Sequence, residues 1–457
     1  MKKLLRFLAL ALTVVCLFTT FACGGGDDTD DGIVLNITYQ DEDAELMLAG
    51  NIGDAFAAKM AEEGVSVKVK YNAITISSYN ADMLKGWNSG DLADVIYTYD
   101  EYASKWAKKG VFENLDSYFE QSNFNFDLYD EYAFNSAKTY NGSIYYAPRT
   151  YDQPVIYVNK DMFTKFGVEV PSAENFTWTK LMEVCRQLRV AMDAEFNATA
   201  LRPIDVNFKW QPIYNAFIRS FGGYIYDAQT DTIGFNEQGT IKAFEKIREM
   251  MDNRYIPATT GGGAGLFTSK KAAMYIMSRP SVINLESRNM TNVAFLPMPI
   301  FDSEFTGLSN NDSYWCYGTT GYAINSRSQK KDLAWKFLQF VMSEEGQNLI
   351  SQSGANVPII KSMQTDPNAT WRKGLEFLKD VDQSAFIFDS AKEAVYKRTL
   401  ATYARTQSSD DEYENTIYTQ VASIIGSLSQ TYDSSKDKTV AEFCQYGYNT
   451  LATAIGK

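Results

Sequence analysis

The chain contains no histidine among its 457 residues. Histidine is the commonest general base in enzymes and the commonest side-chain ligand of transition metals. Its absence excludes Ser-His-Asp and Cys-His catalysis. Chemistry that uses only carboxylates, as in glycosidases, remains open.

Positive charge and cysteine are also scarce. The chain has 43 Lys and Arg against 56 Asp and Glu, a formal net charge of -13. A nucleic-acid partner, which would need a basic surface, is therefore not expected. Cys185 shares helical spacing with Leu181 and Leu188, which predicts a core position. No metal site or cofactor is expected, because no metal-like spacing joins the five cysteines Cys16, Cys23, Cys185, Cys316 and Cys444. The sequence assigns no disulfide and leaves the state of Cys185, Cys316 and Cys444 open.

The N-terminal segment carries a short apolar run. Lys2, Lys3 and Arg6 precede an apolar stretch from Leu8 to Phe18, which is too short to span a bilayer. We expect residues 1–22 to be a signal peptide. Ala22-Cys23-Gly24 resembles a bacterial lipobox, so Cys23 is the expected lipidation site. The Gly- and Asp-rich residues 23–32 then form a flexible tether, and the lipid anchor is the expected contact with the outer face of the cytoplasmic membrane.

Strand and helix patterns alternate from Gly32 onward. Alternating apolar residues predict strands at 33–39, 65–71 and 93–99, and helical spacing predicts a helix over 46–62. This order indicates an α/β fold with a parallel sheet and helices on both faces. Ligands of such sheets bind at the carboxyl ends of the strands. Candidate ligand contacts at those ends are Tyr39, Asp41 and Asp100.

Aromatic residues make up 14% of the chain, with 29 tyrosines. Tyrosine combines an apolar ring with a polar tip, which suits recognition surfaces. Several of these tyrosines fall between residues 144 and 171, around Arg149 and Asp152. A strand ending near Ala147 and a second at 155–158 flank this mixture. It is typical of a cleft wall that binds a polar ligand with flat apolar faces.

A set of ordered motifs covers most of residues 33–362. The motifs are Gly90–Ile96, Ala107–Asp116, Tyr145–Pro148, Ile156–Phe163, Trp178, Phe267–Met274, and Ala334–Gln347 with Pro358. In this order they resemble the motifs of the family 1 extracellular solute-binding proteins, the sugar-binding subunits of ABC importers.

The resemblance implies a two-lobed, type II periplasmic-binding-protein-like fold with hinge-linked lobes and a C-terminal helical region. Lobe one would comprise 33–152 and 293–325, and lobe two 153–292 and 326–457. The chain would cross between them near 148–156, 292–297 and 324–329. The implied function is capture of an extracellular mono- or oligosaccharide by a monomer and its delivery to the permease subunits of an ABC transporter.

The resemblance also carries candidate contacts to further residues. Arg149, Tyr151 and Asp152 lie where the family's contacts follow its proline. In lobe two the candidates are Trp210 and Arg279. Trp315 and Tyr317, just before Gly318, lie on a loop that can line the cleft in the family. If Arg149 and Arg279 share one cleft, an acidic sugar is favoured, since paired guanidinium groups bind carboxylates. Each arginine could instead pair with an acid such as Asp152 or Asp100.

Two other functions remain open. Asp100 and Asp152 could serve as the acid–base pair of a carboxylate-dependent surface glycosidase or lyase. The binding protein could also present its ligand to a membrane sensor kinase. We expect no enzyme activity, because the strand and helix pattern does not continue into an eight-fold barrel.

Overall fold

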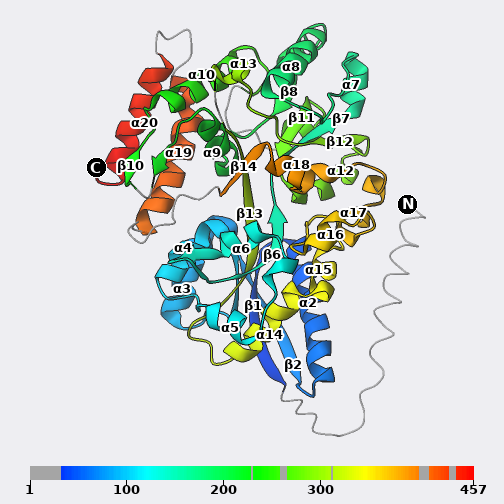
Figure 1. The fold of residues 1–457 in the computed structure, drawn as a ribbon, viewed down its shortest axis with the longest axis vertical. Coiled ribbons are helices and arrows are strands. Elements are labelled where there is room, and N and C mark those ends of the chain that lie inside the picture. Colours follow the sequence, from blue (N-terminus) through cyan, green and yellow to red (C-terminus); the bar gives the residue numbers. More distant parts are fainter. Residues whose placement is uncertain (1–31, 228–229, 258–264, 310–311, 401–410, 432–438) are drawn as a thin grey trace, which may run out of the picture.

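The computed structural model describes residues 32–227, 230–257, 265–309, 312–400, 411–431 and 439–457. The expected signal peptide at 1–22, the lipidation site Cys23 and the tether as far as residue 31 lie outside the described residues. Helices and strands form two lobes, one above the other, joined by extended segments (Figure 1). The predicted two-lobed α/β fold is confirmed.

Lobe one, the lower lobe in Figure 1, contains most of a six-stranded sheet with the order β14-β13-β3-β1-β2, in which β6 also pairs with β13 and β14 lies at the level of the upper lobe. Strand β1 pairs in parallel with β2 and β3, as predicted, whereas β13 runs antiparallel to β3 and β6. The strands are β1 (Ile33–Gln40), β2 (Val67–Ile74), β3 (Val95–Tyr99), β6 (Ala147–Asp152), β13 (Ser313–Ile324) and β14 (Tyr396–Leu400).

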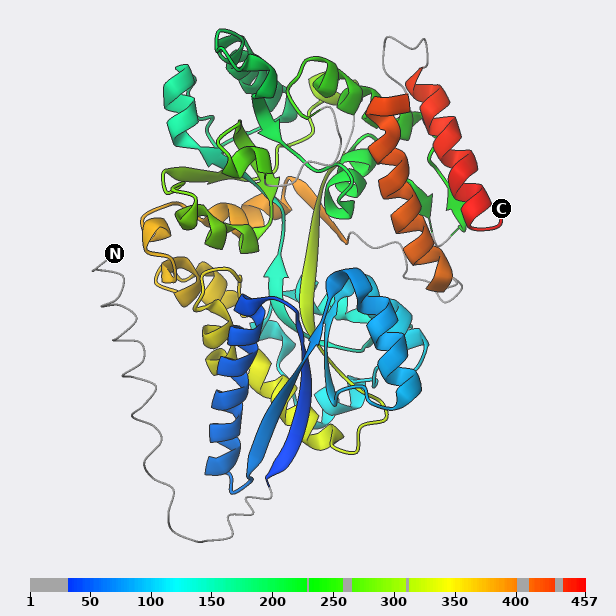
Figure 2. The ribbon, with the colours of Figure 1, turned by 180° about the vertical axis from the view of Figure 1, so that it is seen from behind.

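Helices cover both faces of this sheet. Helix α2 runs alongside β1 and β2 (Figure 2) and buries Leu48, Ile52, Phe56 and Met60. These four residues recur at every fourth position and so form one apolar stripe. The principal helices of lobe one are α2 (Asp43–Glu62), α3 (Tyr79–Ser89), α4 (Asp100–Lys108), α6 (Glu131–Ala137), α14 (Lys331–Met342) and α15 (Glu344–Ser351).

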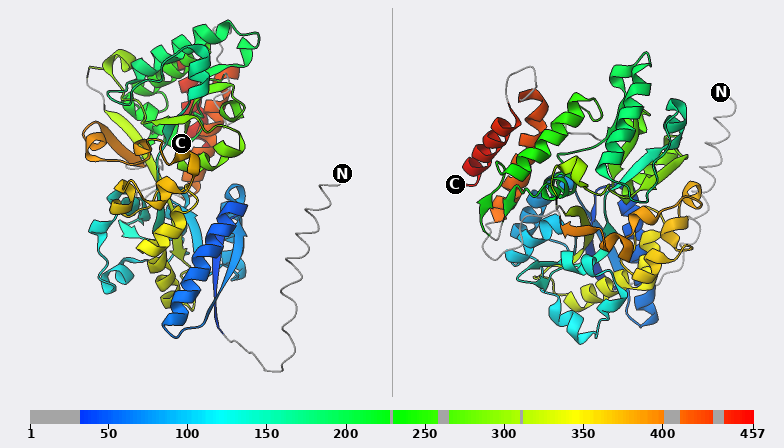
Figure 3. Two further views of the ribbon diagram at one scale, coloured as in Figure 1. Left: turned by 90° about the vertical axis from the view of Figure 1, so that its right-hand side faces the viewer. Right: turned by 45° about the horizontal axis from the view of Figure 1, so that its top comes forward.

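Lobe two contains a four-stranded sheet in the order β12-β7-β11-β8. Its strands are β7 (Val155–Asn159), β8 (Arg202–Asp205), β11 (Ala272–Met277) and β12 (Val293–Leu296). Its principal helices are α7 (Lys160–Phe166), α8 (Trp178–Asp193), α9 (Gln211–Ser220), α10 (Gln238–Asp252), α19 (Asp411–Thr431) and α20 (Val440–Ala454). Helices α19 and α20 pack beside each other, and α20 packs on α10 (Figure 3).

Local sequence signals explain the ends of two of these helices. The Thr177 hydroxyl accepts a hydrogen bond from the Lys180 N–H at 3.2 Å and caps the start of α8. Cys185 lies on the buried face of that helix, as its spacing predicted. Gly167 ends α7 with a φ of 64°, a left-handed conformation that glycine adopts without steric cost.

Two expected lobe boundaries differ from the structure. The expected boundaries put 293–325 in lobe one, but β12 at its start pairs with β7 in the sheet of lobe two. They put 326–457 in lobe two, but α14 and α15 pack against α2 and β6 of lobe one. The third crossing therefore follows α15 and does not fall near 324–329. The apolar pattern predicts that a strand or helix exists, whereas its neighbours depend on long-range pairing.

Candidate functional site

A cavity of about 400 Å³ lies between the two lobes. Lobe one contributes the ends of β1 and β3 with the first turns of α2 and α4. Lobe two contributes the start of α9 and the segment after β11. Residues 149–154, which are the end of β6 and its link to β7, and residues 317–320 of β13 lie between these two walls. We call this space the interlobe cavity.

Strand β13 brings two groups of opposite charge to one face. Side chains of a strand alternate between its faces, so Gly318 and Thr320 share a face. The Thr320 hydroxyl accepts a hydrogen bond from Arg149 Nε at 3.1 Å. A Cβ atom at Gly318 would lie 3.5 Å from Asp100 Oδ2. Asp100 and Arg149 therefore approach neighbouring positions on the same face of β13.

Arg149 forms a buried ion pair with Glu45. Its side chain is 2% exposed, and Nη2 donates to Glu45 Oε1 at 2.9 Å and Oε2 at 2.8 Å. The guanidinium also lies 4.7 Å from the centre of the Tyr97 ring. Burial alone would lower the pKa of Arg149, but the adjacent Glu45 carboxylate raises it above its usual value. Arg149 is therefore a fixed positive charge.

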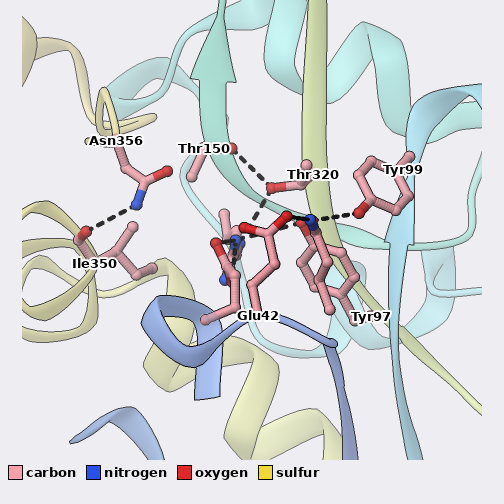
Figure 4. A network of polar contacts seen from close by, with 10 residues as sticks. Glu42, Tyr97, Tyr99, Thr150, Thr320, Ile350 and Asn356 are labelled. Carbon is pink, nitrogen blue, oxygen red and sulfur yellow. Dashed lines mark hydrogen bonds and ion pairs between the residues drawn. The ribbon is translucent and has the colours of Figure 1, made fainter. Parts of the chain in front are cut away.

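Hydroxyl groups surround this ion pair. The Thr150 and Thr320 hydroxyls lie 2.9 Å apart, and Tyr97 and Tyr99 stand on the opposite side of the network (Figure 4). Tyr99 donates its hydroxyl to Gln40, whose amide in turn donates to Glu42 at 2.6 Å. This wall of the cavity is therefore a connected set of hydrogen-bonding groups with fixed orientations.

Aromatic rings form the apolar part of the lining. The Tyr97 and Tyr99 rings meet edge to face with centres 5.1 Å apart. Tyr151 stacks on Tyr317 with ring centres 6.2 Å apart and an angle of 22°. Trp210, immediately before α9, adds a half-buried indole from lobe two. Rings of this kind offer flat surfaces to the C–H faces of a ligand.

Asp152 lies where the chain first passes from lobe one to lobe two. Its Oδ1 accepts hydrogen bonds from the backbone N–H of Gln153 at 3.0 Å and of Arg279 at 3.1 Å. Burial raises the pKa of Asp152 to about 6, although these N–H groups and the Ser278 hydroxyl act in the opposite direction. The carboxylate thus contacts the backbone of lobe two at a crossing between the lobes.

The raised pKa of Asp152 predicts that the free energies of unfolding of wild type and Asp152→Asn differ by an amount that depends on pH. Because the folded state holds this proton more tightly than the unfolded state, the associated stability is complete below about pH 4 and is lost as the pH rises through about 6. The amide does not ionise. We expect Asp152→Asn to gain about 2 kcal/mol of unfolding free energy relative to wild type between pH 4 and 7. Urea unfolding of both proteins measures this, and a difference that stays constant with pH would contradict it.

The structure brings six of the ten candidate ligand contacts to the interlobe cavity. They are Asp100, Arg149, Tyr151, Asp152, Trp210 and Tyr317. The other four, Tyr39, Asp41, Arg279 and Trp315, are not among its lining residues. Asp41 is exposed just beyond β1, and its Oδ2 accepts a hydrogen bond from the Thr75 hydroxyl at 3.5 Å.

Arg279 and Trp315 are buried structural residues. Arg279 is 1% exposed, and its guanidinium donates to the carbonyl groups of Gly354 at 2.8 Å and Trp371 at 2.9 Å. The Trp315 indole donates to the Pro154 carbonyl at 2.8 Å. With Arg149 bound to Glu45 and Arg279 bound to carbonyl groups, no pair of arginines faces the cavity within the described residues.

Sequence reasoning missed several lining residues. Glu45 lies in the first turn of α2. Asn356 lies in the segment after α15, and its side-chain amide donates to the Ile350 carbonyl at 3.2 Å. Tyr97 and Tyr99 are close in sequence to the candidate Asp100 and could have been found from their position at the end of β3. Lining residues outside the ten candidates include Gln40, Glu42, Glu45, Tyr97, Tyr99, Glu101, Thr150, Gln153, Ser278, Thr320 and Asn356.

Two features are absent from the described ranges. None of the helices placed between residues 32 and 457 is both long and apolar enough to cross a membrane. Across the same ranges, with their gaps, no three acidic or cysteine side chains gather as they would around a metal ion.

Solved structures share this fold. An ABC substrate-binding protein from Listeria monocytogenes in complex with cycloalternan has a TM-score of 0.72 and 15% identity, over 93% of this chain and all of that chain. UgpB from Mycobacterium tuberculosis in complex with glycerophosphocholine has a TM-score of 0.71 and 17% identity, over 95% and 99%. The GacH receptor of Streptomyces glaucescens, solved unliganded and with acarbose, has a TM-score of 0.68 and 16% identity, over 93% and 99%.

Sequence comparison identifies the family. A candidate binding protein of Brucella abortus (strain 2308) is 23% identical over 286 residues, and the match spans 60% of this chain and 64% of that relative. The family model described as bacterial extracellular solute-binding protein matches residues 49–348, which is more than half of the chain. Together with the two lobes and the cavity between them, this match shows that the chain belongs to the bacterial extracellular solute-binding protein family.

Proposed function

We propose that this protein captures a mono- or oligosaccharide in the interlobe cavity and delivers it to the permease subunits of an ABC transporter. The observation that carries the proposal is the combination of aromatic rings with fixed polar groups in one cavity between hinge-linked lobes. A sugar ring has apolar C–H faces and polar hydroxyl edges, so it needs both kinds of surface.

The lining has a matching group for each part of a sugar. Trp210 and the Tyr97 and Tyr99 rings offer apolar faces from opposite lobes. Asp100, Glu101 and Asp152 offer carboxylate oxygens that accept hydrogen bonds from hydroxyl groups. The Arg149 guanidinium donates in a fixed direction because Glu45 and Thr320 hold it.

The connections between the lobes suit closure around a ligand. The chain passes between lobes from β6 to β7, from β12 to β13, and again after α15. Domains joined by a few such segments close by hinge bending, with small changes at segment ends. Capture would then bring Trp210 of lobe two toward Asp100 of lobe one.

Export and anchoring form part of the same proposal. They rest on the signal-like residues 1–22 and on Cys23, followed by the Gly- and Asp-rich tether. A protein anchored in this way would hold its cavity at the outer face of the cytoplasmic membrane, within reach of a permease. Membrane contact would then run through the lipid anchor, and the binding protein would act as a monomer.

A thermal-shift screen of residues 24–457 against mono- and oligosaccharides tests the proposed function. A ligand that binds only the folded state raises the melting temperature, by an amount that grows with concentration. We expect one saccharide class to raise it, and that saccharide to be recovered intact. Recovery of cleaved products would favour the glycosidase or lyase instead, and silence across the panel would refute carbohydrate capture.

A further inference from the structure

Negative charge predominates in the lining of the interlobe cavity. Among the described residues that line it, the Arg149 guanidinium accompanies five carboxyl groups. The bidentate contact with Glu45 neutralises Arg149 locally. The carboxyl groups are those of Glu42, Glu45, Asp100, Glu101 and Asp152. A wall of this composition repels an anionic ligand and attracts a cationic one.

Gly318 in β13 neighbours two of these acidic residues. Gly318 is the cross-strand partner of Asp152, and the Asp100 carboxylate lies 3.5 Å from the position that a Cβ of Gly318 would take. The absence of a side chain at Gly318 leaves room beside both acids. Ser278 and two backbone N–H groups bond to Asp152, and the Arg279 guanidinium acts on it without a direct hydrogen bond.

Aromatic rings border the same space. Tyr99 immediately precedes Asp100, and Trp210 faces it from lobe two. The face of an aromatic ring attracts a cation, and the attraction is greater where water is excluded. Carboxylates together with aromatic faces are the groups that bind an ammonium ion. Behind the Tyr151 and Tyr317 rings stands a further cation, Arg398, which forms an ion pair with Asp130 at 3.4 Å.

Arg149 sets a second requirement on the ligand. Its Nη1 is buried and has no hydrogen-bond partner among the described residues. A buried donor without an acceptor is costly, so a ligand oxygen that reaches the Arg149 guanidinium, which lines the cavity, gains affinity. The lining therefore favours an oxygen atom near Arg149 and a positive charge near Asp100 and Asp152.

We propose that the ligand is a saccharide that carries a basic nitrogen, bound with its ammonium group toward Asp100 and Asp152 and with its oxygens toward Arg149. This inference rests on the proposed carbohydrate function and narrows its substrate class. The sequence favoured an acidic sugar only if Arg149 and Arg279 shared one cleft. Arg279 does not line the cavity, so a basic sugar takes the place of that expectation. Glu101, at the start of α4, adds a third carboxyl group to the same wall.

Calorimetric titration with two matched probes tests this inference. Glucosamine oligosaccharides of two to six units carry a free amine on each ring, and their N-acetylated counterparts have the same length and linkage but no charge. At pH 7.5 and low salt we expect the amine probes to bind at least 10-fold more tightly. Added salt should narrow the difference, because it screens the attraction between charges.

Three variants locate the effect in the cavity. Asp100→Asn and Asp152→Asn each remove one negative charge with little change of shape, and each should weaken the amine probe at least 10-fold. The matched control is Glu62→Gln, which removes an exposed charge at the far end of α2 and should leave binding unchanged. Melting temperatures measured without ligand show whether each variant is folded. If only one of the two aspartate variants folds, that variant alone can be compared with Glu62→Gln.

The outcomes separate this inference from the proposed function. Equal or tighter binding of the N-acetylated probes, or binding of neutral maltooligosaccharides but not of the amines, would overturn the inference and leave carbohydrate capture intact. Binding of spermidine without any saccharide would overturn both. The inference would also be overturned if Glu62→Gln weakened amine binding as much as the aspartate variants do. The effect of charge would then not come from residues that line the cavity.

Discussion

Replacing Arg149 with methionine is expected to lower the free energy of unfolding by about 3 kcal/mol, because it leaves the Glu45 carboxylate without its partner. The Arg149 side chain is 2% exposed and that of Glu45 is 19% exposed, so water reaches the remaining charge poorly. Thr320 and Tyr97 would lose their contacts with the guanidinium as well. Urea unfolding followed by circular dichroism measures the loss.

Two comparisons show whether the ion pair is the cause. The double variant Arg149→Met with Glu45→Gln should recover part of the loss, since no unpaired charge remains. Lys59→Met breaks an exposed pair with Glu345, in which the two side chains are 45% and 56% exposed, and should cost less than about 1 kcal/mol. A cost below about 1 kcal/mol for Arg149→Met as well would mean that water reaches Glu45 freely.

Replacing Gly318 with leucine is expected to weaken ligand binding at least 100-fold while the protein stays folded. Gly318 shares a face of β13 with Thr320, and a side chain there would extend toward the Asp100 carboxylate. A leucine side chain would fill the space beside Asp100 and Asp152 and exclude the ligand. About 100-fold in affinity corresponds to about 2.7 kcal/mol. Titration with whichever saccharide raises the melting temperature of the wild type measures the effect.

The matched control for this prediction is Gly318→Ala. Its Cβ would lie 3.5 Å from Asp100 Oδ2, an ordinary contact distance, so binding should change by less than about 10-fold. Unchanged binding in Gly318→Leu would show that the ligand does not occupy this part of the cavity. Equal melting temperatures for the three proteins without ligand would separate lost binding from lost folding.

Both predictions depend on one side of the cavity, where the sequence was partly informative. Asp100 was expected at the end of a parallel strand because ligand contacts gather at the carboxyl ends of such strands. Arg149 and Asp152 were expected from their place after Pro148 in the family pattern. All three line the interlobe cavity. Glu45, the partner of Arg149, was missed, because nothing in the sequence around residue 45 indicates a partner that lies 104 residues away.

Other site residues show where such reasoning fails. Arg279 and Trp315 carry the polar groups expected of a binding site, yet the guanidinium donates to the Gly354 and Trp371 carbonyl groups and the indole donates to the Pro154 carbonyl. Buried polar side chains need partners, and loops that lie far apart in sequence supply them here. A residue type alone does not indicate whether its partner is a ligand or a carbonyl group.

The sequence by itself determined the class of the protein. Its apolar periodicity predicted the strands and helices of the α/β fold, since burial of an apolar stripe is a local property of each element. The absence of histidine narrowed the chemistry, and the order of motifs identified the solute-binding family. Only the tertiary structure decided that β12 joins lobe two, that α14 and α15 join lobe one, and that Arg149 is paired with Glu45. These arrangements depend on contacts between residues that are distant in sequence. Strand pairing, burial and charge act together there and produce no periodic pattern in the sequence.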